Sequence, residues 1–65
     1  MELIINGKRR EAECNTVTTL LDYLRLDKDA VAVELNKIIV HRENFNDTKL
    51  KDNDKLEIVK AVGGG

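Results

Sequence analysis

Residues 1–25 read MELIINGKRREAECNTVTTLLDYLR, and this stretch decides the fold. Hydrophobic side chains alternate along residues 1–5, and the β-branched residues among them favour an extended chain. Asn6-Gly7 follows, which is the strongest short signal for a hairpin because both residues tolerate positive φ. Residues 8–13 are predicted to return as a polar edge strand, whose charges discourage pairing with other chains.

The second half of this stretch predicts one short helix. Thr16 is the expected N-cap, because its hydroxyl can accept a hydrogen bond from a free backbone N–H of the first turn. The apolar residues that follow have the i, i+3, i+4, i+7 spacing of one helix face: Val17, Leu20, Leu21 and Leu24. A helix over residues 17–25 is too short to be stable alone, so it must dock on a sheet.

Three more strands are predicted after the helix. Their ranges are residues 30–35, 38–40 and 55–62. Asn36-Lys37 is predicted to be a turn, and the polar segment around Phe45 is predicted to be a loop. Asp52-Asn53-Asp54 is a dense turn signal just before the last strand.

The order of these elements predicts an α+β fold, in which a mixed sheet carries one main helix across one face. A ubiquitin-like β-grasp satisfies this order in 65 residues, with the last strand beside the first. We expect a β-grasp domain over residues 1–62 and a flexible glycine tail over residues 63–65. The predicted core consists of Leu3, Ile5, Val17, Leu20, Leu21, Leu24, Val33, Leu35, Leu56 and Ile58.

Length and composition narrow the classes of function. A domain of this size buries only about 60% of the surface of its unfolded chain, which leaves little room for an enclosed active site. A net charge of −1 and two aromatic residues disfavour binding to nucleic acid or to anionic membranes. Cys14 is the only cysteine, which excludes an intrachain disulfide and favours a cytoplasmic protein. Neither a signal peptide nor a membrane-spanning segment is predicted.

Few side chains are candidates for catalysis or metal binding. Cys14 and His41 could be imagined as nucleophile and base, but nothing in the sequence brings them together, and a metal would need more ligands. Asp52 and Asp54 lack the glycine and the distant glutamate of a calcium loop, so we interpret them as part of a solvated turn. We therefore predict no catalytic and no metal-binding residue.

The Gly63-Gly64-Gly65 segment is different in kind. Glycines lack packing side chains and carry the largest ordering entropy, so three in succession do not stabilise a strand. They reach about 10 Å when extended, and they can enter a slot too narrow for other residues. The carboxylate of Gly65 would be unhindered and open to activation by a partner. An inert chain end remains the alternative interpretation of this segment alone.

The whole chain resembles the ThiS family, the sulfur carriers of thiamine thiazole biosynthesis. The matching features are Asn6-Gly7, Thr16-Val17, Leu20-Leu21, Val31–Asn36, Val40–Glu43, Leu50–Asp54 and Gly64-Gly65. Their order carries the resemblance more than any single feature does. Asn53 stands where a glycine is usual in the family, but asparagine also tolerates the left-handed region. Gly63 is an additional glycine before the usual pair.

The resemblance implies that the chain is a carrier and a protein substrate, and that it is not an enzyme. An E1-like adenylating enzyme (ThiF-type) would use MgATP to activate the carboxylate of Gly65, while Gly63 and Gly64 thread its active site. Sulfur from a cysteine desulfurase route would then give a thiocarboxylate, which would donate its sulfur to a ThiG-type thiazole synthase. The chain itself is expected to bind no cofactor and to be a monomer.

The sheet face away from the helix is the predicted docking surface. Ile4, Val59 and Ala61 are expected on or near it, and an apolar patch with a charged rim often marks a protein interface. Two alternatives stay open. The chain could carry sulfur for molybdopterin or another metabolite, or it could be a ubiquitin-like interaction module without sulfur chemistry.

Overall fold

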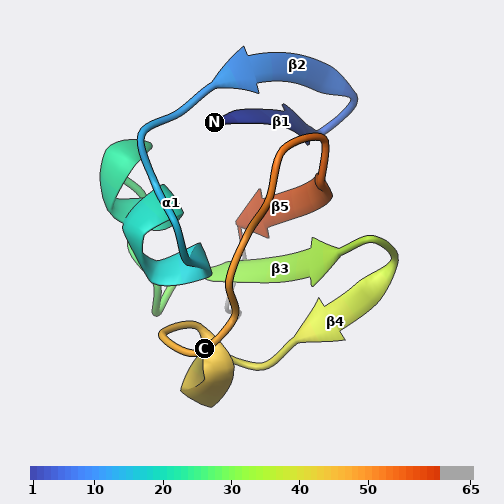
Figure 1. Ribbon diagram of the computed structural model, residues 1–65. Coiled ribbons are helices and arrows are strands. Elements are labelled where there is room, and N and C mark those ends of the chain that lie inside the picture. The colour runs from blue at the N-terminus through green and yellow to red at the C-terminus, as the bar shows by residue number, and fades with distance from the viewer. Residues whose placement is uncertain (61–65) are drawn as a thin grey trace.

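A computed structural model describes residues 1–60, which form a five-stranded mixed sheet with one α-helix packed on one face (Figure 1). The elements are β1 (Glu2–Ile5), β2 (Lys8–Glu11), α1 (Val17–Tyr23), β3 (Val31–Leu35), β4 (Ile38–Val40), the 3-10 helix η1 (Arg42–Asn44) and β5 (Lys55–Lys60). The predicted site residues Ala61, Gly63, Gly64 and Gly65, and the expected domain boundary after residue 62, lie outside the described residues. Within residues 1–60, no helix is long and apolar enough to cross a membrane.

The strand order is β2-β1-β5-β3-β4, so the last strand lies in the middle of the sheet (Figure 1). β5 runs parallel to β1, with Ile5 opposite Leu56, and antiparallel to β3, with Val31 opposite Lys60. This confirms the predicted pairing of the first and last strands. β1 pairs with β5 only at Lys55 and Leu56, whereas β3 pairs with it from Leu56 to Lys60, so the last residues of β5 are held by β3.

Two tight turns join the antiparallel pairs. Asn6 and Gly7 have φ of 51° and 81°, and Asn36 and Lys37 have φ of 50° and 72°. Positive φ at both central residues is what a type I′ hairpin turn requires. The predicted turns are therefore confirmed, although Lys37 holds a conformation that its residue type does not suggest.

The helix begins as predicted but ends two residues earlier. Thr16 and Thr19 form a reciprocal capping box: the Thr16 hydroxyl accepts from the Thr19 N–H at 3.2 Å, and the Thr19 hydroxyl accepts from the Thr16 N–H at 2.9 Å. At the other end Arg25 has φ of 59°. The N–H of Leu26 then donates to the carbonyl of Leu21 at 2.9 Å, which closes a Schellman motif and stops the helix.

Most of the predicted core is buried, with two corrections and three additions. Leu24 and Leu35 are only half-buried, because Leu24 lies in the helix cap and Leu35 at the end of β3. Ala12, Phe45 and Leu50 are buried and were not predicted. Phe45 is 3% exposed although its neighbours are polar, because the backbone after η1 bonds to α1 through the Thr18 N–H. A single aromatic residue thus closes the core under a segment predicted as a loop.

The prediction that Asp54 lies in a solvated turn is wrong. Its side chain is 4% exposed, and its carboxylate accepts from the Lys51 N–H at 2.9 Å, the Asn36 amide at 3.1 Å and the Lys51 ammonium at 3.2 Å. Burial alone raises the pKa of Asp54, but these hydrogen bonds lower it by more, so the pKa lies below its usual value. Asp54 therefore ties the β3–β4 turn to the turn that starts β5.

Candidate functional site

The described part of the predicted site is the strand that leads to the glycines, together with the surfaces on either side of it. Val59 is 57% exposed and lies on the sheet face away from α1, as predicted. Ile4 is half-buried and lies opposite Lys55, four positions from Val59 along β5. The structure therefore does not bring Ile4 and Val59 together into one patch.

The exposed apolar surface on this face extends toward β4 instead. A shallow hollow of about 400 Å³ lies over β3, β4 and β5 and is lined by Ala32, Ile39 and Val59, among others. Ile39 is 63% exposed and was missed, because a three-residue strand gives little indication of its face. The signal that could have found it is the register, which places Ile39 opposite Glu34 on the face opposite Val33.

The same hollow is acidic. Glu34 lies directly opposite Glu57 in the β3–β5 ladder, and both line the hollow. Like charges in direct opposition destabilise a sheet. Neither carboxylate forms an ion pair with any of residues 1–60. This hollow thus combines apolar and acidic groups, and it suits a partner surface that carries cations.

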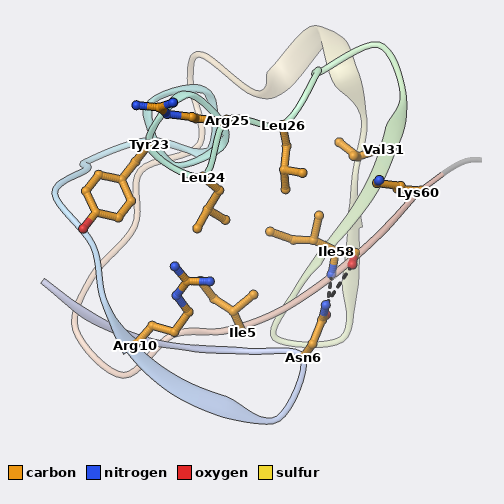
Figure 2. Close-up of a pocket in the computed structure, with 10 residues that line it drawn as sticks. All are labelled: Ile5, Asn6, Arg10, Tyr23, Leu24, Arg25, Leu26, Val31, Ile58 and Lys60. Carbon is orange, nitrogen blue, oxygen red and sulfur yellow. Dashed lines mark hydrogen bonds between the residues drawn. The ribbon is translucent and has the colours of Figure 1, made fainter.

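A second hollow, of about 370 Å³, lies on the other side of the sheet, between the end of α1 and strands β1, β2 and β5 (Figure 2). Figure 2 shows Ile5, Leu24, Leu26 and Ile58 directed toward its centre. We call it the helix-end groove. It borders Lys60, the last described residue of β5.

The surroundings of Cys14 and His41 indicate structural roles for both residues. The Cys14 thiol is half-buried and donates to the Ala12 carbonyl at 3.9 Å. Burial raises the pKa of Cys14, which disfavours the reactive thiolate. His41 is the N-cap residue of η1 and makes no side-chain capping bond there. Within the described residues, no cluster of three histidine, cysteine, aspartate or glutamate side chains could hold a metal ion.

Comparison with known proteins identifies the family of this chain. The model of the ThiS family matches residues 3–65, which include the glycines. The chain belongs to the ThiS family. It is 38% identical over 65 residues to the sulfur carrier protein ThiS of Bacillus subtilis, and the match covers 97% of this chain and 98% of that protein.

Solved structures agree with this membership. The crystal structure of the thiamine biosynthesis protein ThiS from Geobacter metallireducens superposes with a TM-score of 0.84, with 38% identity and full coverage of both chains. The ubiquitin-like β-grasp expected from the sequence is thereby confirmed. The ThiS-like region also occurs inside larger proteins: the chain is 44% identical to part of a thiazole synthase of Paramagnetospirillum magneticum, of which it spans 20%.

Proposed function

We propose that this chain carries sulfur on the carboxylate of Gly65 and delivers it for the thiazole of thiamine. The observation that supports this most is the ThiS family match, which runs through Gly65. The fold supports it as well. β5 lies in the middle of the sheet, and its last residues, which precede the glycines in the sequence, are paired with β3.

The proposed chemistry begins with activation by a ThiF-type adenylating enzyme. A Gly65 carboxylate oxygen attacks the α-phosphorus of MgATP, and pyrophosphate leaves. A persulfide sulfur, supplied by a cysteine desulfurase route, then attacks the acyl carbon and displaces AMP. Attack by a second thiol on the new S–S bond releases the Gly65 thiocarboxylate. The carrier supplies the carboxyl group, the reach and the docking surface, while its partners supply the acid–base and metal chemistry.

The open face of the sheet is the proposed docking surface for the adenylating enzyme. Ile39 and Val59 offer exposed apolar area, and Glu34 and Glu57 add an unneutralised pair of carboxylates. A partner with an apolar patch flanked by lysine or arginine would bury the exposed apolar area and neutralise the two carboxylates. Such complementarity sets specificity and the rate of association. Ala61, outside the described residues, remains a predicted member of this surface, whereas Ile4 lies apart from Val59, opposite Lys55.

The thiazole synthase is the proposed sulfur acceptor. A synthase that includes a ThiS-like region supports this choice over a molybdopterin pathway. An interaction module without sulfur chemistry would not need glycines at this position, and its mass would not change on incubation with an adenylating enzyme and ATP.

The test is a reconstitution that is followed by intact mass. The chain is incubated with a ThiF-type enzyme, MgATP, a cysteine desulfurase and cysteine. We expect a mass gain equal to the replacement of one oxygen by sulfur, and no gain without ATP. Addition of thiazole synthase and its substrates should return the original mass. No gain would favour the interaction module, and a stable thiocarboxylate that the synthase does not consume would favour another acceptor.

A further inference from the structure

The helix-end groove has an apolar floor and a cationic rim. Its floor is aliphatic, and Figure 2 shows the Arg10 side chain extending from β2 toward Leu24. Arg25 and Lys60 also line it, and no acidic residue does. None of these cations forms an ion pair with any other of residues 1–60. The groove therefore carries positive charge that the described part of the chain leaves unneutralised.

Arg25 has a strained backbone conformation. Its φ of 59° lies in the left-handed region, at the C′ position where a Schellman motif favours glycine. A glycine would close the helix with less strain, but it would bring no charge to the groove. Backbone strain of this kind concentrates at functional sites. A binding role for the guanidinium accounts for an arginine at this position.

The two hollows beside β5 are lined by groups of opposite charge. The open face carries the Glu34–Glu57 pair, whereas the helix-end groove carries Arg10, Arg25 and Lys60. Both surfaces border the strand that leads to Gly65, so an enzyme that takes up the glycines meets at least one of them. A carrier that visits two enzymes in turn can distinguish them by charge, since like-charged contacts exclude the wrong partner.

We propose that the helix-end groove binds an acidic segment of the thiazole synthase. An aliphatic side chain of that segment would rest on Leu24 and Leu26, and a neighbouring carboxylate would lie between Arg10 and Arg25. This inference rests on the proposed function, because it assigns the second partner of the same carrier. The adenylating enzyme would then bind the acidic hollow on the open face.

The test compares three single variants, and a double variant that combines Arg10→Gln with Arg25→Gly, by calorimetric titration with the thiazole synthase. Arg10→Gln and Arg25→Gly each remove one cation, and Lys49→Gln removes an exposed cation near the start of α1, at the other end of the helix. We expect each groove variant to weaken binding by about three- to tenfold, as for rim charges, and the double variant to show a weaker dependence on salt. Lys49→Gln should bind like the parent.

Stability provides a second readout. Arg25→Gly should raise the melting temperature while it weakens binding, because glycine relieves the strain at φ of 59°. A folding defect therefore cannot explain the loss. Unchanged affinity in the double variant, or an equal loss in Lys49→Gln, would overturn the proposal. The proposal would also be overturned if the groove variants lost more affinity for the adenylating enzyme than for the synthase. It would be overturned as well if millimolar inorganic phosphate alone competed with the synthase for the groove. ATP–pyrophosphate exchange by the parent chain reports the proposed function separately, since the titration uses neither ATP nor sulfur.

Discussion

Asn6 holds the backbone of Ile58 with both ends of its side-chain amide. Its Nδ2 donates to the Ile58 carbonyl at 3.0 Å, and its Oδ1 accepts from the Ile58 N–H at 2.8 Å (Figure 2). β1 turns away at this point, so the amide replaces the backbone partner that the strand no longer provides. Asn36 acts similarly at the other end of β5, where its Oδ1 accepts from the Lys55 N–H at 3.0 Å.

The first prediction removes this amide. Asn6→Gly keeps a residue that tolerates φ of 51° but leaves both Ile58 groups without their partner. We expect a loss of about 1–3 kcal/mol in the free energy of unfolding. Hydrogen exchange at the Ile58 amide should accelerate more than exchange at core amides of α1. Asn53→Gly is the matched control, because Asn53 also has positive φ, but its side chain bonds only to Arg9 on the surface. Equal effects of the two substitutions would argue against the role of Asn6.

The second prediction concerns acid stability. The pKa of Asp54 lies below its usual value of 3.8, so its carboxylate stabilises the fold above that pH. This contribution is lost as the pH falls through the pKa of the folded state. We expect Asp54→Asn to lose about 1.5–3 kcal/mol at pH 7, the range for hydrogen bonds to a charged group, and to depend less on pH at the acid end.

Urea unfolding at several pH values measures this difference. The exposed Lys51 ammonium contributes little to it, since an ion pair with one solvated partner is weak. The control is Asp47→Asn, a substitution of an exposed aspartate. If Asp54→Asn and the parent had parallel pH profiles below pH 4, the buried carboxylate would not be the cause of the acid sensitivity.

The third prediction tests the core. Leu20 is fully buried, so Leu20→Ala should cost about 2–5 kcal/mol, comparable to the whole stability of so small a domain. Leu24→Ala should cost clearly less, because the side chain of Leu24 is half-buried and faces the helix-end groove. Thermal melts of the two variants distinguish them. A larger loss in Leu24→Ala would mean that the end of α1 carries more of the core than its burial indicates.

Much of the fold could be predicted because its signals are local. Asn6-Gly7, the Thr16 cap and the apolar spacing behind it each depend on neighbours within one or two turns of chain. The errors fall where the decisive partner is distant. Asp54 bonds to Asn36, which is 18 positions away, as well as to nearby Lys51, and nothing around Asp54 in the sequence reveals the distant contact.

The site could be predicted only in part, for a similar reason. The glycines and the face of Val59 follow from sequence, whereas the acidic pair arises from the β3–β5 register, which places Glu34 opposite Glu57. The helix-end groove depends on a strained Arg25, and sequence spacing predicted that the helix would continue through it. Residues that break a local rule are thus the ones that sequence reasoning misses.

The fourth prediction concerns docking on the open face. Val59→Glu adds a charge to an exposed apolar position and should weaken binding to the adenylating enzyme, while the fold stays intact because Val59 packs little. Ile38→Glu is the matched control: Ile38 is 70% exposed and lies opposite Leu35, on the other face of the sheet. A binding titration measures both. Unchanged affinity in Val59→Glu would indicate that the exposed aliphatic residues of this face are not a docking surface.

The fifth prediction places the chemistry at Gly65. Reaction requires the attacking oxygen at about 3–3.5 Å from the phosphorus and in line with the leaving group. Deletion of Gly65 withdraws the carboxylate by about 3.3–3.6 Å, the length of one extended residue. One residue added after Gly65 turns the carboxylate into an amide, which is a far poorer nucleophile, and pushes the new carboxylate past the reaction point. Both variants should therefore lose adenylation.

Gly64→Val should lose it for a different reason, because a β-branched side chain would have to enter a slot shaped for bare backbone. None of the three changes touches the buried residues of the domain, so the melting temperature should match that of the parent. ATP–pyrophosphate exchange with the adenylating enzyme measures the loss, and the unchanged melt shows that it does not come from unfolding. Full exchange by the chain without Gly65, or by the extended chain, would mean that another group receives the adenylate, and the carrier function proposed here would be wrong.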